Sequence, residues 1–418
     1  MNSLLDKKGD IKFSDKRVES TIVFTGDLCP VFRLEDYLLK GDFANVFGDT
    51  LEVLQSSDLN IVNLETVLCE NVEPIEKLGP CLKVNPKIAE QLKKIPIHVA
   101  CLANNHMLDF NEGGLNQTTQ ALKNAKISFV GAGISIEEAE APLFVTTNNI
   151  KICILNFVLA GAPINFEKAH TAMLEPRKNC IAIKKSKAEG YLVVPVIHTG
   201  KEQVLLPAPS LRDTCKDFID AGASAVICHH PHVPQGFEIY ENKPIVYSLG
   251  NFLFDWNIAE PETDSSYFIS LGLDNSSVIN LKVHPFAKIK EFGGIGLLKN
   301  QDFEEYIDLL NQISEPLADS KMYDNLWKEQ CRILYEKFYC SKIERATILS
   351  NPLDPKYKMA ASTFHNFFAH KTHSDVLCQI MKMITCNEMA SVITSKDWLL
   401  SKMEALKKFS INQKGSNL

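Results

Sequence analysis

The sequence lacks several features that would place it quickly in a functional class. Its 418 residues carry a formal net charge of −7, whereas nucleic-acid-binding proteins generally show an excess of basic residues, so we expect no nucleic-acid partner. No two of its 12 cysteines form a Cys-x-x-Cys pair, which argues against zinc-ribbon and thioredoxin-like motifs. The wide spacing of these cysteines also favours a reducing compartment over a disulfide framework.

Long apolar runs are missing as well. The first twenty residues contain charges throughout, whereas a signal peptide needs an uninterrupted apolar stretch of roughly 7–15 residues. No run approaches the ~18 apolar residues of a membrane-spanning helix. We therefore expect a cytoplasmic protein without a membrane anchor. The absence of a Gly-x-x-x-x-Gly-Lys-Ser/Thr loop disfavours an ATP-driven ligase that acts alone.

What the sequence does contain, between residues 21 and 290, is an alternation of short apolar runs and amphipathic stretches. Runs such as TIVFTG, KICILNFV and YLVVPVIH are almost entirely apolar, which is typical of strands buried on both faces. Their alternation with predicted helices indicates an α/β layered domain. EIYENKPIVYS and SYFISLGLDNSSVINLKVHPF are each predicted to form a β-hairpin.

After residue 292 the spacing of apolar residues becomes helical. We therefore predict an N-terminal tail (1–19), an α/β domain (20–295) and a helical C-terminal region (296–418). The C-terminal helices are a candidate surface for a protein partner. The aromatic-rich stretch 364–373 is better explained by packing within a helical core.

Polar side chains gather where the predicted strands end. Ligand sites in open α/β sheets form beyond the carboxyl ends of the strands, so we expect these side chains to share one rim. The residues concerned are Asp27, Asn63, Glu65, Asn104, Asn105, His106, Asp109, His198, His229, His230, His232 and Asn251. This mixture of carboxylate, amide and imidazole groups suits manganese, iron or zinc.

Taken singly, these residues have simpler explanations. Asp27 alone would be a turn or cap residue, and His198 alone would be a buried core histidine. The pair His230 and His232 is more specific, because an extended backbone points alternate side chains to one side and would turn His229 to the other. Five successive strand ends with ligand-type side chains favour a metal site over these separate explanations.

Five stretches resemble the CapA family of poly-γ-glutamate capsule-synthesis proteins, whose domain is similar to calcineurin-like metallophosphoesterases. They are GDLCP (26–30), NLETVL (63–68), LANNHMLDFNEGGL (102–115), HTGKE (198–202) and HHPHVPQGFEIYENKPIVYSLGNFLFD (229–255). The resemblance spans residues 20 to about 290 and omits the C-terminal helices. It implies an α/β fold of four layers, with two β-sheets flanked by helices and a site for one or two divalent metal ions at one rim.

The resemblance also implies roles for individual residues. The metal ligands would be Asp27, Glu65, Asn105, His198, His230 and His232, with Glu65 at the position of a bridging aspartate. His106 would be the catalytic histidine, and Asp109, three residues further on, is placed to orient it. Cys29 stands where phosphoesterases usually have a histidine ligand. The absence of that histidine removes an imidazole from one of two metal positions. Asn251 is a candidate for substrate binding.

Three functions are compatible with such a site. The first is metal-assisted hydrolysis of a phosphoester in a small molecule, with His106 stabilising the equatorial oxygens or protonating the leaving group. The second is a role in making a γ-glutamyl polymer, as an enzyme acting on its amide bonds or as an accessory factor. The third is a non-catalytic binding module stabilised by metal.

Overall fold

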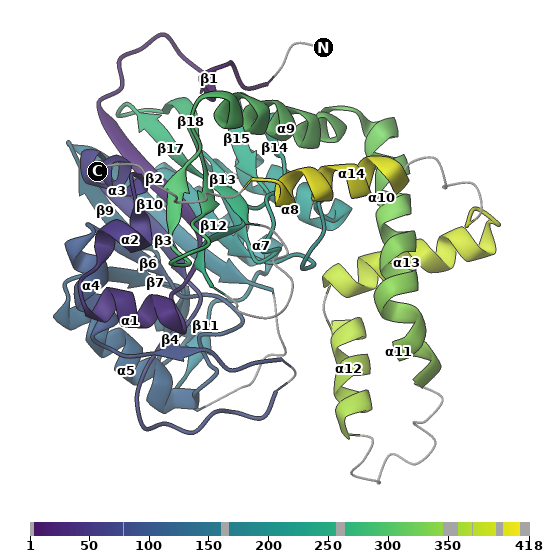
Figure 1. Ribbon diagram of the computed structural model, residues 1–418, viewed down its shortest axis with the longest axis horizontal. Helices are drawn as coiled ribbons and strands as arrows, with labels where there is room; N and C mark the ends of the chain where they lie inside the picture. The colour runs from purple at the N-terminus through teal and green to yellow at the C-terminus, as the bar shows by residue number, and fades with distance from the viewer. Residues whose placement is uncertain are drawn as a thin grey trace.

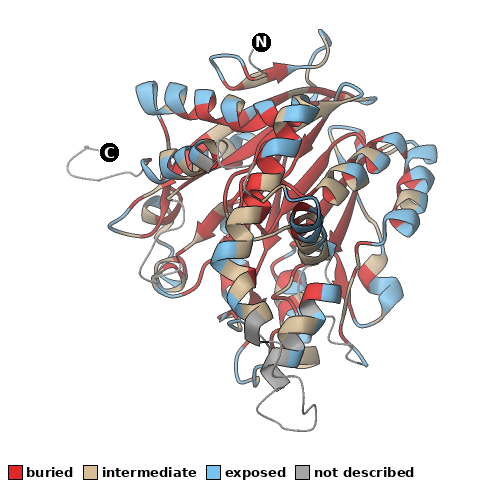
Figure 2. Cartoon of the chain, turned by 90° about the vertical axis from the view of Figure 1, so that its right-hand side faces the viewer, coloured by how far each residue is buried: buried red, intermediate tan, exposed pale blue. Residues whose placement is uncertain are grey.

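Two β-sheets lie against each other at the centre of the molecule, and helices cover their outer faces (Figure 1). The computed structural model describes residues 4–77, 79–159, 167–255, 264–345, 358–369, 371–389 and 396–409. Figure 2 shows that the strands form most of the buried interior.

The larger sheet has the strand order β1-β18-β17-β2-β3-β6-β7, with β16 beside β2 and β19 beside β18. Its strands are β1 (Asp10–Lys12), β2 (Ser20–Cys29), β3 (Leu59–Leu64), β6 (Val99–Cys101), β7 (Ser128–Val130), β16 (Asn251–Phe254), β17 (Ser265–Leu273), β18 (Val278–Lys288) and β19 (Ile295–Leu297). The run β2-β3-β6-β7 is parallel, so the carboxyl ends of these strands meet at one edge.

The smaller sheet has the order β14-β15-β13-β12-β10-β9. Its strands are β9 (Leu143–Thr147), β10 (Ile150–Val158), β12 (Leu192–His198), β13 (Val226–His229), β14 (Phe237–Tyr240) and β15 (Lys243–Val246). Both predicted hairpins are confirmed, as β14–β15 and β17–β18. Two small ribbons pair β4 (Val67–Leu68) with β5 (Lys83–Val84), and β8 (Ala132–Gly133) with β11 (His170–Thr171).

Alternate residues of the larger sheet face different layers. Ile22 and Phe24 of β2 pack in the core shared with the smaller sheet. Val23 of the same strand packs against the helices on the outer face, as Val62 of β3 does. This alternation follows from the period of two along a strand, and it explains why both strands read as almost continuous apolar runs.

Helices form the two outer layers, and the four-layered α/β fold implied by the resemblance is confirmed. Over the larger sheet lie α1 (Arg33–Leu39), α2 (Phe43–Phe47), α3 (Thr50–Ser56), α4 (Ile88–Lys94) and α5 (Asn111–Asn124). The smaller sheet is covered by α7 (Pro176–Ala188) and α8 (Pro209–Asp220), and α6 (Ile136–Glu140) contacts β8.

The chain after Asn300 is helical in the part that the structure describes. Its elements are α9 (Asn300–Ala318), α10 (Ser320–Leu334), the π-helix η1 (Tyr335–Tyr339), α11 (Cys340–Arg345), α12 (Lys358–Ala369), α13 (Lys371–Thr385) and α14 (Lys396–Lys407). Buried residues of these helices, including Tyr306, Leu310 and Val376, join the core of the sheets. None of the described helices has the length and apolarity needed to cross a bilayer. The division of the chain into domains stays a prediction.

The segment expected to be an N-terminal tail contributes to the fold. Asp10 to Lys12 pair with β18 at the edge of the larger sheet. Leu5 is buried, and its backbone N–H donates to the Asn311 side chain on α9. The early residues therefore connect the sheet edge to the C-terminal helices.

A backbone irregularity in β2 positions the first acidic residue of the rim. The pairing of β2 with β3 shifts register between Phe24 and Asp27, as a β-bulge does. Within this shift Gly26 lies directly against the backbone of Gly250, and the Asp27 N–H donates to the Gly250 carbonyl at 3.0 Å. A side chain at position 26 has no room, because it would overlap that carbonyl oxygen.

Replacing Gly26 with alanine is expected to lower the free energy of unfolding by about 1–3 kcal/mol, the usual cost of overpacking. Denaturant unfolding followed by circular dichroism would measure the change. Gly113→Ala is the matched control, because its added methyl group would meet only side chains and would lie within helix α5. Equal midpoints for Gly26→Ala and the unmodified protein would contradict this account of β2.

Candidate metal centre

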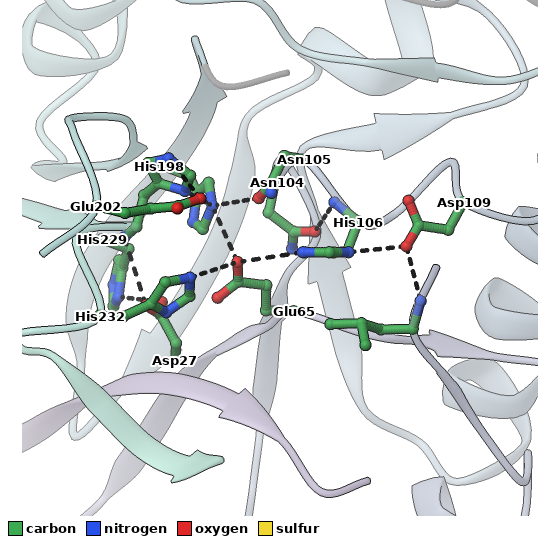
Figure 3. Close-up of polar contacts among 12 residues, drawn as sticks. Asp27, Glu65, Asn104, Asn105, His106, Asp109, His198, Glu202, His229 and His232 are labelled. Carbon is green, nitrogen blue, oxygen red and sulfur yellow. Dashed lines mark hydrogen bonds and ion pairs between the residues drawn. The ribbon is translucent and has the colours of Figure 1, made fainter. Parts of the chain in front are cut away.

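The structure brings the six predicted metal ligands together at the rim where the two sheets meet. Figure 3 labels all of them except His230. Asp27 lies in β2, His198 ends β12, and the other four follow strand ends in loops. The Glu65 backbone N–H donates to the carbonyl of Leu28 at 2.9 Å, which fixes the loop after β3 beside β2. The predicted convergence is therefore present, while the ligand roles stay a prediction.

Glu65 occupies the middle of this cluster. Its side chain is fully buried, and neither carboxylate oxygen has a hydrogen-bond partner among the described residues. Its Oε1 faces Nε2 of His198 at 3.4 Å, of His232 at 3.7 Å and of His106 at 4.0 Å. Burial, followed by the charge of Asp27, raises the pKa of Glu65 well above its usual range. Burial thus favours the neutral acid, and an ionised Glu65 requires a nearby positive charge.

On one side of Glu65 lie His198, His230 and Asn105. The His198 Nε2 is 2.7 Å from Asn105 Oδ1 and 3.1 Å from His230 Nδ1. Burial lowers the pKa of both histidines well below the usual value, so both are neutral near pH 7. Two neutral imidazoles, an amide oxygen and a carboxylate oxygen facing one point suit a borderline divalent cation.

On the other side of Glu65 lie Asp27 and His232. The Asp27 Oδ2 is 3.4 Å from His232 Nδ1, and its Oδ1 accepts a hydrogen bond from Asn63 Nδ2 at 2.8 Å. Burial lowers the pKa of His232, but the carboxylates of Glu65 and Asp27 outweigh it and raise the pKa to about 10. A protonated His232 thus supplies one positive charge that a cation could supply instead.

Cys29 is fully buried, at the position where a histidine ligand was expected from the resemblance. Burial, followed by the charge of Glu65, raises the pKa of its thiol well above the usual value. Among the described residues, none of the groups of converging ligand atoms includes the Cys29 thiol. The donor set beside Asp27 is therefore smaller than the set beside His198.

The prediction that the HHPH stretch has an extended backbone, with His229 facing away from His230 and His232, is wrong. Strand β13 ends at His229, and His230 and His232 have φ of 100° and 58°, which is not extended backbone. The turned chain also brings His229, expected to face away, to 3.2 Å between its Nδ1 and Asp27 Oδ1. All three histidines of this stretch consequently face the acidic cluster.

His106 and Asp109 form a separate pair beside Glu65. The His106 Nδ1 is 2.7 Å from Asp109 Oδ2, which also accepts from the Leu82 backbone N–H at 2.8 Å. This leaves the His106 Nε2 facing the cluster. The predicted orienting contact of Asp109 is thus seen in the structure, whereas catalysis by His106 stays a prediction.

Lys77 contacts this pair, and the sequence patterns did not reveal it. Its ammonium group pairs with Asp109 Oδ1 and donates to the backbone carbonyl of Asn105 at 3.2 Å. Lys77 comes from an irregular segment between β4 and β5, without a strand end or motif to mark it. Burial lowers the pKa of His106; the hydrogen bond to Asp109 opposes this, and the charge of Lys77 adds to it.

Asn251 lies at the edge of the cluster and is partly exposed. Its Oδ1 is 2.9 Å from His232 Nδ1, so it fixes the orientation of that imidazole. Binding of substrate by Asn251 stays a prediction.

Three overlapping groups of acidic and histidine side chains offer ligand atoms within 4.8 Å of one another. They are Glu65, His198 and His230; Asp27, Glu65 and His232; and Glu202, His230 and His232. Because Glu65 lacks hydrogen-bond donors and joins the first two groups, these residues fit one cation or a bridged pair.

Comparison with known proteins matches residues 21–256 to the family described as "Bacterial capsule synthesis protein PGA_cap". "Capsule biosynthesis protein CapA" of Bacillus anthracis is 30% identical over 245 residues, which cover 56% of this chain and 60% of that protein. "PGA biosynthesis protein CapA" of Bacillus subtilis is 31% identical over 238 residues, covering 56% of this chain and 62% of that protein. The match thus spans about three fifths of the length of these relatives.

A "Probable polyglutamine synthesis accessory protein" of Mycobacterium tuberculosis is 30% identical over 234 residues, which cover 52% of this chain and 62% of that protein. Among solved structures, a 5'-nucleotidase from Candida albicans aligns with a TM-score of 0.40 and 10% identity, covering 74% of this chain and 60% of that chain. The helices from α9 onward lie outside the residues matched to the family.

Manganese or zinc ions are expected to raise the melting temperature of the metal-free protein. A cation would compensate the buried Glu65 carboxylate, and a ligand at 100 times its dissociation constant stabilises a fold by about 2.7 kcal/mol. Thermal unfolding with and without a chelator, together with elemental analysis, would measure this effect. The Glu65→Gln variant should lose the shift, and an equal shift in both proteins would contradict the assignment of Glu65.

Replacing Lys77 with methionine is expected to raise the pKa of His106, because the ammonium group of Lys77 disfavours a second positive charge on the imidazole. His106 of the variant would then bind its proton at a higher pH than in the unmodified protein. NMR titration of the metal-free protein would measure the pKa. Lys83→Met, which removes a cation over the Phe110 ring, is the control. A lower or unchanged pKa of His106 in Lys77→Met would show that the charge of Lys77 does not lower the pKa of His106.

Proposed function

This chain belongs to the family of bacterial capsule synthesis proteins called PGA_cap, and on that premise we propose that it is a metal-dependent hydrolase acting in capsule or polyglutamate metabolism. The observation that carries the proposal is the Glu65 carboxylate, which is fully buried, lacks hydrogen-bond donors and faces three imidazole nitrogens. A divalent cation is the group that such a set of donors fits best.

The proposed cation ligands are Asp27, Glu65, Asn105, His198, His230 and His232. A divalent cation held there lowers the pKa of water toward neutrality and offsets negative charge on a substrate. The neutral state of His198 and His230 supports this role, because metal ligands have to be deprotonated. One cation has a full set of candidate ligands beside His198, and a second would have fewer beside Asp27.

His106 is proposed to act on the substrate, stabilising its phosphoryl oxygens or, in its protonated form, donating a proton to the leaving group. Its Nδ1 is engaged by Asp109, which leaves Nε2 directed at the cluster, 4.0 Å from Glu65. Lys77 and the Leu82 N–H hold Asp109 from the opposite side. The imidazole is therefore fixed in ring orientation, as a general acid requires.

Two kinds of bond are candidates for cleavage. The resemblance to metallophosphoesterases favours a phosphoester. The names of the Bacillus relatives, which refer to capsule and PGA biosynthesis, favour a γ-glutamyl amide. Cation-assisted hydrolysis serves carbonyl as well as phosphoryl centres.

A second proposal is a non-catalytic role as an accessory factor stabilised by metal. It is supported by Cys29, which stands where phosphoesterases usually have a histidine ligand and belongs to none of the groups of converging ligand atoms among the described residues. The mycobacterial relative is itself named an accessory protein. The C-terminal helices would then provide the surface for a protein partner, with Phe368 on α12 as its most exposed aromatic residue among those described.

The variant His106→Ala is expected to reduce hydrolysis by about 10²–10⁴-fold while the bound metal remains, because general acid catalysis typically contributes that much. A panel of phosphomonoesters, phosphodiesters and γ-glutamyl peptides would measure activity, and elemental analysis would measure the metal. His170→Ala, on the short ribbon strand β11, is the control. Metal-bound protein that cleaves no member of the panel would favour the accessory role, and unchanged turnover in His106→Ala would remove His106 from the chemistry.

A further inference from the structure

Glu202 places a carboxylate on the solvent side of the metal centre. Its Oε1 lies 4.0 Å from His230 Nε2, and it forms with His230 and His232 one of the groups whose ligand atoms lie within 4.8 Å of one another. Its side chain is 50% exposed, whereas those of Glu65 and Asp27 are fully buried. Figure 3 shows the Glu202 carboxylate pointing into the group of histidines. Its carboxylate therefore borders both the histidines and the solvent.

The loop that carries Glu202 is fixed to the loop that carries the histidines. The Thr199 N–H donates to the His229 carbonyl at 3.0 Å, and the Gln203 N–H donates to the Pro231 carbonyl at 3.0 Å. These two bonds flank Glu202 in sequence. The backbone on both sides of its side chain is thus held against the histidine loop.

The C-terminal helices hold the same loop from outside. The Gln330 side chain on α10 accepts from the Leu206 N–H and donates to the Leu206 carbonyl, each at 3.0 Å. The Lys201 ammonium lies 4.5 Å from the ring centre of Phe338 in the π-helix η1. Glu202 is consequently positioned by three parts of the fold, unlike an ordinary exposed glutamate.

Glu202 carries a negative charge at this point. Half of its side chain is exposed to solvent, so its carboxylate is ionised near neutral pH as that of an ordinary glutamate is. The charge reaches the interior, where it contributes to the raised pKa of Glu65. A phosphate group that approached the cluster would therefore meet an anion beside the histidines.

A phosphate monoester and an amide would meet this carboxylate differently. Phosphate oxygens are acceptors that carry negative charge, so Glu202 repels them and offers them no donor. An amide has a neutral carbonyl for the cation site and an adjacent N–H that can donate a hydrogen bond to a carboxylate. Repulsion of one ligand combined with a hydrogen bond to the other is a common basis of specificity.

We infer that Glu202 determines the substrate class of the site, excluding phosphate dianions and admitting an amide carbonyl whose N–H it binds. This inference rests on the proposed hydrolase function and chooses between its two candidate bonds. It also assigns a task to the C-terminal helices, which hold the Glu202 loop in place.

The Glu202→Gln variant tests the inference, because it keeps the size of the side chain and replaces its charge with a donor. Calorimetric titration of the manganese-loaded protein with inorganic phosphate should show binding about tenfold tighter than in the unmodified protein. The ratio of kcat/KM for p-nitrophenyl phosphate to that for γ-glutamyl-p-nitroanilide should rise at least tenfold. Glu304→Gln, which removes the same charge from an exposed position on α9, should change neither quantity.

Three results would overturn the inference. They are unchanged phosphate affinity in Glu202→Gln, loss of bound manganese from that variant, which would make Glu202 a ligand, or an unmodified protein that cleaves the phosphoester in preference to the anilide. Failure of the proposed function itself would look different, as manganese-bound protein that cleaves neither compound. The phosphate titration would still report the effect of the Glu202 charge in that case.

Discussion

The Glu65 carboxyl group is fully buried, so its ionised form has to be stabilised by nearby positive charge. Three imidazole nitrogens face it, and no hydrogen-bond donor satisfies its oxygens among the described residues. The raised pKa of His232 is the response of the site to this demand. Much of the rim can be understood as an arrangement that surrounds one buried anion with groups able to hold a cation.

The two-sheet architecture makes that arrangement available to residues far apart in the sequence. Parallel strands of the larger sheet deliver Asp27, Glu65 and Asn105, and those of the smaller sheet deliver His198 and His230. The strands themselves are apolar because both of their faces are covered. The polar residues of the proposed site therefore stand at or just after the carboxyl ends of the strands, at the rim where the two sheets meet.

The contrast between apolar strands and polar strand ends explains how much of the fold and of the candidate site the sequence predicts. The apolar runs identify the strands, and the residues after them identify the cluster, because a strand end is marked by an abrupt change in polarity. The backbone of the HHPH stretch could not be predicted, since positive φ at His230 and His232 leaves no pattern in residue type. Lys77 and the placement of Glu202 depend on loop paths fixed by tertiary contacts, which local periodicity does not encode.

The hydrogen bonds between Gln330 and Leu206 join a helix outside the family match to the loop that carries Glu202, at a residue four positions further on. The residue proposed to select the substrate lies beside the proposed cation ligands, whereas part of the support of its loop comes from a helix outside the family match. On the inference made for Glu202, substitutions at Gln330 would change which compounds bind and would leave the proposed cation ligands unchanged. An engineer seeking a new reactant preference would begin there, at a packing contact remote from the reacting atoms.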